Sequence, residues 1–373
     1  MSPFFRAPPG SRPERMKASP RFAAGTFHNP SGAAPGLKSG TTLATMGEFF
    51  LGGQRRTPVA PLPSESPIER WTRPADSGLR ATWLGHSTVL VEIDGCRVLT
   101  DPVWSDRASP VGFAGPKRFQ PVPVPIQGLP PLDAVIVSHD HYDHLDRASI
   151  LALLPSGVPF ITSLGVGAHL ESWGVPAARI TELDWWESVE VGALTLTAAP
   201  SQHFSGRGPR DRNRTLWSSF AVRGPRRAFF FSGDTGLTPE YAEIRTRLGP
   251  FDLVMLEVGA FHPSWGTIHL GPENALQALA LLGGGSFLPV HWGTFNLAIH
   301  AWDDPAETLL TLAPKQDVRL VMPRLGAPVE PGQVDRVEPW WREVSGMEKG
   351  AERAPRAAEE GEGEALPVGD PID

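Results

Sequence analysis

The chain has a single cysteine, Cys96, and only two tyrosines among its 373 residues, and it carries no excess of positive charge. One cysteine excludes an intramolecular disulfide and a thiolate metal cluster. Cys96 lies beside the turn at Asp94-Gly95, and we expect it to be a core residue. The net charge of −7 argues against nucleic acid as the main partner. No apolar run approaches the roughly 18 residues of a membrane span, and the N-terminus does not resemble a signal peptide. These absences favour a cytoplasmic protein.

Glycine and proline are abundant, with 39 and 40 residues, while 40% of the chain is hydrophobic. The hydrophobic content is sufficient for a full core, but it is not spread evenly. Residues 1–40 have six basic side chains and one acidic one, whereas residues 347–373 have eight acidic and three basic ones. Because both ends have few large apolar residues, we predict a poorly ordered basic arm at 1–45, a folded domain at 46–345 and an acidic disordered tail at 346–373.

The folded domain combines hairpin patterns with helical patterns. Alternating segments turn at Asp94-Gly95, at Gly192 and at Gly224-Pro225, which are typical hairpin turn residues. We expect further strands at 134–138, 252–256 and 286–290, and helices at 147–154, 165–172, 238–248 and 272–282. Hairpins with interspersed helices favour an α/β layered sandwich.

The most informative segment is 138–146, which follows the apolar strand at 134–138. It contains His139, His141, Asp143 and His144 in the spacing H-x-H-x-D-H. A zinc ion takes three or four nitrogen or oxygen ligands at ~2.0–2.2 Å. This segment therefore offers ligands for more than one ion, and surface histidines on an ordinary loop are a poor alternative.

Three further candidate ligands each follow a short apolar strand. His203 comes after 194–198, Asp234 comes after 228–232, and His291 comes after 287–290. Functional residues are often found just beyond the ends of strands. Taken singly, each of these residues also suits a turn or cap, but together with the histidine-rich segment they indicate a metal site.

This ligand set resembles that of the metallo-β-lactamase superfamily. Within it, the chain is most similar to the N-acylphosphatidylethanolamine-hydrolysing phospholipase D group and its bacterial relatives. The similarity covers about residues 78–305, with a fainter match at Phe27-His28-Asn29-Pro30. It is carried by the segments Thr82-Trp83-Leu84-Gly85-His86-Ser87-Thr88, Leu99-Thr100-Asp101-Pro102, Arg107-Ala108-Ser109-Pro110, Gly115-Pro116-Lys117-Arg118-Phe119, Ser232-Gly233-Asp234-Thr235-Gly236 and His291-Trp292-Gly293-Thr294-Phe295.

The resemblance implies an αββα sandwich with a dizinc site at one edge of its sheets. One zinc would bind His139, His141 and His203. The other would bind Asp143, His144 and His291, and Asp234 would bridge the two ions. Two such ions can share a hydroxide and hold the oxygens of a phosphodiester, and iron or manganese could replace zinc in this ligand set.

The same resemblance suggests roles for residues around the metals. Asp143 and His269 are the candidate catalytic residues, with helix capping as the alternative for His269. Lys117 and Arg118 are candidates for phosphate recognition, although a solvated loop pair is an equal alternative. Glu257 either faces the site or is a paired structural acid, and His86 either orients the metal loop or is structural.

The predicted function is cleavage of a phosphodiester, in an N-acylphosphatidylethanolamine-like phospholipid. The alternatives are a lactonase or a hydrolase of soluble phosphodiesters, then a nuclease, and finally a non-catalytic metal or lipid carrier. Twelve tryptophans and the run Phe49-Phe50-Leu51 favour a lipid substrate and peripheral contact with the inner face of a membrane. Core packing is the alternative for most of the tryptophans.

Overall fold

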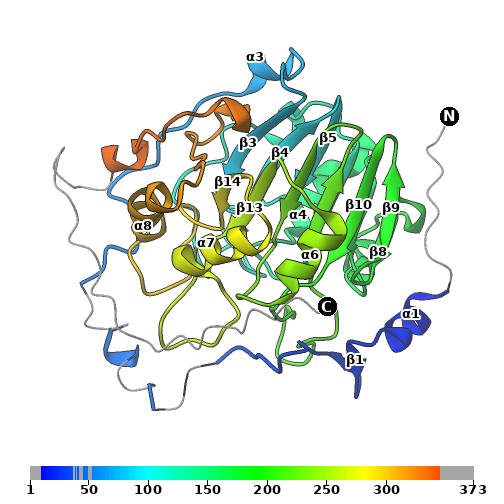
Figure 1. Ribbon diagram of the computed structural model, residues 1–373. Helices are drawn as coiled ribbons and strands as arrows, with labels where there is room; N and C mark the ends of the chain where they lie inside the picture. Colours follow the sequence, from blue (N-terminus) through cyan, green and yellow to red (C-terminus); the bar gives the residue numbers. More distant parts are fainter. Residues whose placement is uncertain (1–9, 37, 39, 42–44, 49–52, 345–373) are drawn as a thin grey trace, which may run out of the picture.

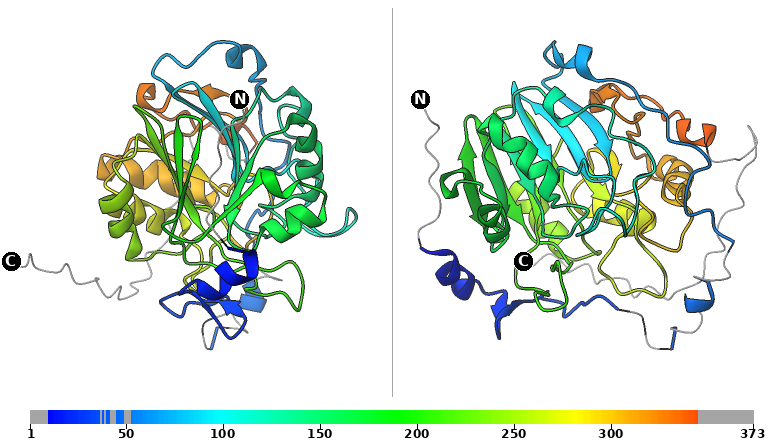
Figure 2. Two further views of the ribbon diagram at one scale, coloured as in Figure 1. Left: turned by 90° about the vertical axis from the view of Figure 1, so that its right-hand side faces the viewer. Right: turned by 180° about the vertical axis from the view of Figure 1, so that it is seen from behind.

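The computed structural model describes residues 10–36, 38, 40–41, 45–48 and 53–344 (Figure 1). Two β-sheets lie face to face, and helices cover the outer face of each, as the edge-on view of Figure 2 shows. This arrangement is the predicted αββα sandwich. The run Phe49-Phe50-Leu51 and the predicted acidic tail lie outside the described residues.

One sheet has seven strands in the order β15-β3-β4-β5-β6-β7-β8. Strands β3 to β5 are antiparallel neighbours, and β5 to β8 run parallel. The strands are β3 (Leu79–Gly85), β4 (Thr88–Ile93), β5 (Cys96–Thr100), β6 (Ala134–Val137), β7 (Phe160–Ser163), β8 (Ile180–Leu183) and β15 (Pro328–Val329).

The other sheet has six strands in the order β14-β13-β12-β11-β10-β9. Strands β9 to β12 form antiparallel pairs, and β12 to β14 run parallel. The strands are β9 (Ser188–Val191), β10 (Leu194–Ala199), β11 (Ser219–Arg223), β12 (Ala228–Phe231), β13 (Leu253–Glu257) and β14 (Ser286–Val290). The three predicted hairpins are therefore confirmed as β4–β5, β9–β10 and β11–β12.

Helices α4 and α5 cover the seven-stranded sheet, while α6, α7 and α8 cover the six-stranded one (Figure 2). The helices are α3 (Ile68–Trp71), α4 (Arg147–Leu153), α5 (Gly167–Ser172), α6 (Glu240–Leu248), α7 (Gly271–Leu281) and α8 (Asp304–Leu312). The four predicted helices correspond to α4 to α7. No helix in the described part of the chain is long and apolar enough to cross a membrane.

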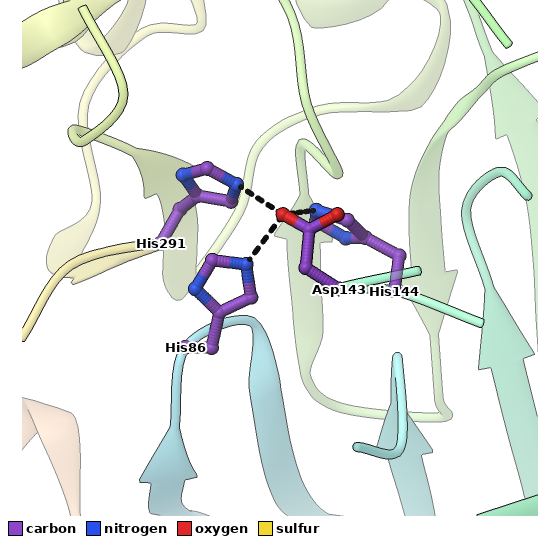
Figure 3. Close-up of side chains that lie close together, drawn as sticks. All are labelled: His86, Asp143, His144 and His291. Atoms are coloured by element: carbon purple, nitrogen blue, oxygen red, sulfur yellow. Dashed lines mark hydrogen bonds and ion pairs between the residues drawn. The ribbon is translucent and has the colours of Figure 1, made fainter. Parts of the chain in front are cut away.

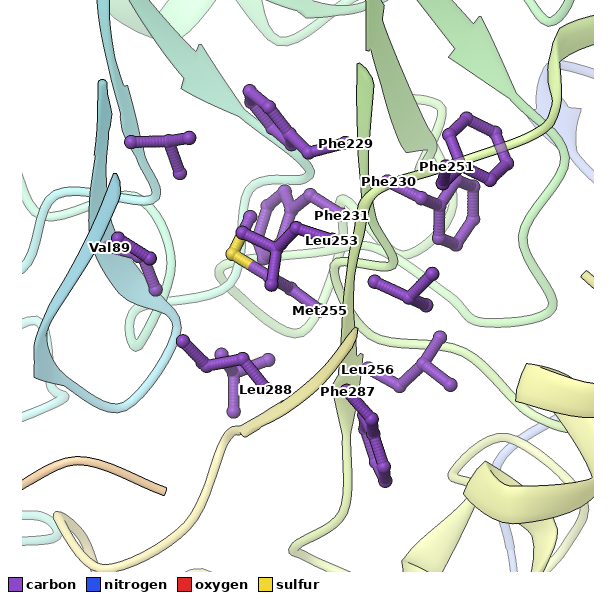
Figure 4. Close-up of a cluster of buried hydrophobic side chains, with 14 of the residues drawn as sticks. Val89, Phe229, Phe230, Phe231, Phe251, Leu253, Met255, Leu256, Phe287 and Leu288 are labelled. Carbon is purple, nitrogen blue, oxygen red and sulfur yellow. The ribbon is translucent and has the colours of Figure 1, made fainter. Parts of the chain in front are cut away.

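Strand β12 shows how the core is built. Phe229 and Phe231 point between the sheets toward Val89 of β4 (Figure 4). Phe230 points to the outer face, where its ring centroid lies 5.5 Å from that of Phe251. Because both faces of the strand are covered, β12 is a continuous apolar run rather than an alternating one.

The N-terminal arm differs from the expected poor order. Residues 10–36 contain helix α1 (Arg12–Ala18) and a small sheet of β1 (Phe22–Ala23) and β2 (Thr26–Phe27). The side chain of Phe27 is fully buried against the domain. Contacts with segments more than 150 residues away order this part of the arm, and such contacts leave no local signal in composition.

Parallel strands place several chain segments at one edge of the sandwich. The carboxyl ends of β5 and β6 meet there with those of β12, β13 and β14. In α/β proteins, functional sites form at the carboxyl ends of parallel strands. The residues that follow these five strands include His139, Asp234 and His291.

Candidate metal centre

The histidine-rich segment forms a tight turn between β6 and α4. The backbone N–H groups of His144 and Leu145 both donate to the carbonyl of His141, at 3.1 and 2.8 Å. Asp146 then caps α4, since its side chain accepts from the N–H of Ala148. This turn presents its side chains at the edge of the sandwich, where they join two clusters of candidate ligands.

The first cluster contains His139, His141, His203 and Asp234, one ligand atom from each lying within 4.8 Å of the others. Nε2 of His139 lies 2.8 Å from Nδ1 of His141, which is 3.3 Å from Nε2 of His203. His139 and His203 are both 1% exposed. Three imidazole nitrogens thus converge on one point.

The second cluster contains His86, Asp143, His144 and His291. Figure 3 shows the three imidazoles around one oxygen of Asp143, Oδ2. This oxygen lies 3.0 Å from Nε2 of His86, 3.3 Å from Nε2 of His291 and 3.5 Å from Nε2 of His144. His86 therefore contacts Asp143 of the metal loop directly, which favours the role of orienting that loop over a purely structural one.

Asp234 lies between the clusters. Its Oδ1 is 3.2 Å from Nε2 of His144, and its Oδ2 is 3.2 Å from Nε2 of His291 and 3.7 Å from Nε2 of His203. The same carboxylate groups with His269 and His291 in a third set of neighbouring ligand atoms. One carboxylate thus faces both clusters, as the sequence resemblance implies.

Two sheets supply these loops, and the backbone ties them together. The N–H of His291, after β14, donates to the carbonyl of His86, in the β3–β4 turn, at 3.0 Å. Both residues have positive φ angles, 65° and 53°. Such a backbone is unfavourable for a non-glycine residue, and structures retain it mostly at functional positions.

Buried acceptors fix the orientation of two imidazoles. Nδ1 of His144 lies 2.7 Å from Oδ2 of Asp101, and Nδ1 of His203 lies 3.0 Å from the carbonyl of Ile268. Asp101 also accepts from the N–H and hydroxyl of Ser138, at 2.7 and 2.6 Å. A partner at Nδ1 keeps the proton there and leaves Nε2 free to bind a metal. Sequence reasoning gave Asp101 no role, although it directly follows β5 at the same edge.

Opposite electrostatic environments exist within the site. Burial, together with the neighbouring imidazoles His144 and His141, holds the pKa of His139 well below its usual value. For His144, burial opposes the charged form, but Asp234 and Asp143 raise the pKa well above its usual value. His144 thus favours positive charge and His139 does not. A carboxylate neighbour alone is not sufficient, because burial and His291 lower the pKa of His86 to about 3 although Asp143 lies beside it.

The residues present fit metal ions. Nε2 of His139, Nδ1 of His141 and Nε2 of His203 converge at separations of 2.8 and 3.3 Å, and a cation placed among them would accept a lone pair from each ring. Nε2 of His144 and Oδ1 of Asp234 are buried without a hydrogen-bond partner among the described residues. Five imidazoles with two carboxylates and no thiolate suit zinc and also accept iron or manganese.

Glu257 and His269 form a pair beside this centre. Oε1 of Glu257 lies 3.1 Å from Nδ1 of His269 and accepts from the N–H of Leu270 at 2.7 Å. The Glu257 side chain is fully buried. The structure thus favours the role of a paired structural acid for Glu257 over that of an acid facing the site. Its partner, His269, lies next to the two clusters of candidate metal ligands.

Lys117 and Arg118 are not brought to the clusters. The guanidinium of Arg118 is buried, donates to the carbonyls of Val103 and Ser105 at 2.5 and 3.4 Å, and lies over the Phe295 ring. Burial lowers its pKa to about 10. Lys117 is exposed on the surface. Arg118 therefore supports the backbone of 103–105, which the sequence could not show because its side chain packs under a loop.

Two glycines allow loops of the site to approach each other closely. A Cβ atom at Gly259, after β13, would lie 1.9 Å from the carbonyl oxygen of His291. A Cβ atom at Gly236 would lie 1.7 Å from the carbonyl oxygen of Thr267, in the loop before His269. Any side chain at these positions would displace loops that carry His291 and His269.

An αββα sandwich with paired histidine–carboxylate clusters at one sheet edge is the architecture of the metallo-β-lactamase fold. A family model described as beta-lactamase superfamily domain matches residues 96–292. The chain belongs to the metallo-β-lactamase superfamily and is a hydrolase of that superfamily.

Curated relatives support the family, and solved structures share the fold. An uncharacterized protein of Mycobacterium tuberculosis is 50% identical over 289 residues, which cover 76% of this chain and 77% of that protein. N-acyl-phosphatidylethanolamine-hydrolyzing phospholipase D 1 of Caenorhabditis elegans is 38% identical over 298 residues, or 73% and 81% of the two chains. The isothiocyanate hydrolase from Delia radicum gut bacteria shares the fold, with a TM-score of 0.54 and 22% identity over 67% of this chain and 98% of that chain.

Proposed function

We propose that this protein is a dizinc hydrolase that cleaves the phosphodiester bond of an N-acylphosphatidylethanolamine-like phospholipid. The observation that carries the proposal is the position of Asp234 between two histidine clusters, at the edge where the loops of both sheets meet. The phospholipase D relative of Caenorhabditis elegans supports the substrate class.

In this proposal, His139, His141 and His203 would hold one zinc ion, and Asp143, His144 and His291 would hold the other. Asp234 would contact both ions. Two bound zinc ions would supply Lewis acidity and a water of lowered pKa, so that no serine or cysteine nucleophile is required. Asp101 and the carbonyl of Ile268 keep the imidazoles of His144 and His203 in the orientation that this binding needs.

His269 is the proposed proton carrier. Its ring lies with centroids 5.0 and 5.6 Å from those of His203 and His291, close to the reacting region. Glu257 accepts from Nδ1, so the lone pair of Nε2 is available in that tautomer. Such a group can hold a proton for the leaving oxygen. Asp143 acts by binding metal and by accepting from His86.

A groove beside His291 supports a lipid substrate. A small cavity of about 20 Å³ reaches His291 and shares Arg56 and residues 296–298 with a larger one of about 440 Å³. The larger cavity is lined by Thr45, Met46, Arg56, Trp265, Asn296, Leu297, Ala298 and Ile299. This lining is mainly apolar and suits acyl chains, while Arg56, where the two cavities join, suits the phosphate. Met46, which lines the larger cavity and is 51% exposed, suits peripheral contact with a membrane.

The test is a hydrolysis screen of the zinc-loaded protein on long-chain lipid phosphodiesters, soluble phosphodiesters with the same head group, lactones and RNA. We expect the long-chain lipid to be the best substrate, because each buried methylene contributes ~0.8 kcal/mol of binding. Better turnover of a soluble phosphodiester or a lactone would instead establish one of the alternative functions.

A variant pair locates the acyl site. Leu297→Asp should lower turnover of the lipid while a small chromogenic phosphodiester is hydrolysed at nearly the unchanged rate. Ile68→Asp is the control, because it places the same charge on an apolar residue that lies on α3, outside the groove lining. Equal losses on both substrates would contradict the assignment of the groove.

A further inference from the structure

The N-terminal arm reaches the candidate metal centre through one buried side chain, that of Asn29. This residue follows β2 and is 8% exposed. Nδ2 of Asn29 donates to the carbonyl of His203 at 2.7 Å, and the N–H of His203 donates to Oδ1 of Asn29 at 3.2 Å. A single amide thus bonds both backbone polar groups of His203, in the way a neighbouring strand would.

His203 needs such a partner because it lies beyond the sheet. Strand β10 pairs with its neighbours only up to Ala199, and a proline follows at position 200. The backbone of residues 201–203 therefore has no strand-pairing hydrogen bonds with β9 or β11. The remaining bonds of the amide hold it in place: Nδ2 donates to the carbonyl of Ala33 at 2.7 Å, and Oδ1 accepts from Nε1 of Trp217 at 3.1 Å.

The arm itself is fixed to the domain away from the metal centre. Arg12 on α1 pairs with Glu182 at 2.6 Å and with Glu171 at 2.9 Å, and Arg15 pairs with Glu187. Phe27 is buried in a cluster with Leu164, Trp185, Leu216 and Trp217. Asn29 is therefore presented by an anchored segment rather than by a free chain end.

The arm then continues toward the loop that precedes His269. The hydroxyl of Ser31 donates to Oε1 of Gln202 at 2.6 Å, and Nε2 of Gln202 donates to the carbonyl of Thr267 at 2.6 Å. Further on, the N–H of Gly266 donates to the carbonyl of Gly36 at 3.0 Å. The arm thus contacts the loops that carry His203 and His269.

We propose that Asn29 is a positioning residue, which sets the backbone of His203 and thereby the affinity of the metal held by His139, His141 and His203. This inference rests on the proposed function, since it requires that these histidines bind metal. An amide is needed rather than a carboxylate, because two of its bonds are donated to carbonyl oxygens.

The test compares zinc binding by the metal-free full-length protein and its variants, in competition with a chelator of known affinity. Asn29→Asp keeps the shape of the side chain but replaces the donors by acceptors that face two carbonyls. We expect one binding step to weaken about 10- to 100-fold, while the other changes less than about twofold. The absorption spectrum of the cobalt(II)-loaded Asn29→Asp variant should also differ from that of the wild type, because the spectrum reports the arrangement of the metal ligands.

His28→Ala is the matched control, because His28 is the exposed neighbour of Asn29 and bonds only within the arm. It should leave both binding steps unchanged. Asn29→Ala serves as a second variant if the aspartate variant does not fold, and it should weaken the same step to a smaller extent.

Two results would overturn the proposed role of Asn29, and a third would contradict the proposed function itself. If Asn29→Asp lowers the melting temperature but leaves zinc affinity and the cobalt spectrum unchanged, the arm is only a structural clamp. If both binding steps weaken equally, Asn29 stabilises the whole edge rather than His203. A wild-type protein that binds no zinc would contradict the proposed function, and this inference with it.

Discussion

The buried carboxylate of Glu257 lies 3.1 Å from Nδ1 of His269, at the end of β13 and two residues before a position that only glycine can occupy, Gly259. We predict that Glu257→Gln lowers kcat by about 10- to 100-fold and changes KM little, because the proposed proton carrier loses its charged partner. Steady-state kinetics over a range of pH would measure this. A variant with unchanged kcat and an unchanged pH profile would show that the pair serves only the fold.

Asp234→Asn should abolish turnover without unfolding the domain. The amide cannot offer a charged oxygen to both clusters, whereas the core between the sheets does not depend on this edge residue. Turnover and far-ultraviolet circular dichroism, measured on the same sample, check both parts. Retained circular dichroism with unchanged turnover would refute the dizinc mechanism.

Purified protein should contain about two equivalents of zinc, and their removal should destabilise it. A ligand present at 100 times its Kd stabilises the folded state by about 2.7 kcal/mol, so chelation should lower the melting temperature by several degrees. Elemental analysis and thermal unfolding with and without chelator are the measurements. Less than about half an equivalent of metal after gentle purification would count against the centre.

Arg118→Ala should reduce stability rather than substrate affinity. Its loss leaves the carbonyls of Val103 and Ser105 without their buried donor, which costs about 1–3 kcal/mol. Lys117→Ala is the control, because an exposed side chain of this kind usually contributes less than about 0.5 kcal/mol. Thermal unfolding together with KM would decide, and a raised KM with unchanged stability would restore the phosphate-binding role.

Local chemistry made part of the fold predictable. Asp94 and Gly95 both have positive φ angles, 48° and 87°, as the two-residue hairpin turn expected from Asp-Gly requires. The sequence could not show that β8 and β9, which are separated by only four residues, belong to different sheets. Which sheet a strand joins depends on pairing with distant segments.

The candidate site was predictable where ligands follow apolar strands, and all seven proposed ligands lie in the two clusters. Residues that act on the ligands were harder to recognise. Asp101 and Asn29 stand 43 and 174 positions from the histidines they contact. Both residues lie in segments that match the family, but that match assigns them no role, so only the three-dimensional contact gives them one.

The close approaches at Gly236 and Gly259 set limits for anyone who wishes to redirect this enzyme by laboratory evolution. Positions such as Leu297 and Trp265 border open space, so a randomised library can vary them freely in search of a new leaving group or chain length. At the two glycines, a carbonyl oxygen already occupies the place of the first side-chain atom. Variants there should be lost from any selection, whichever substrate is used.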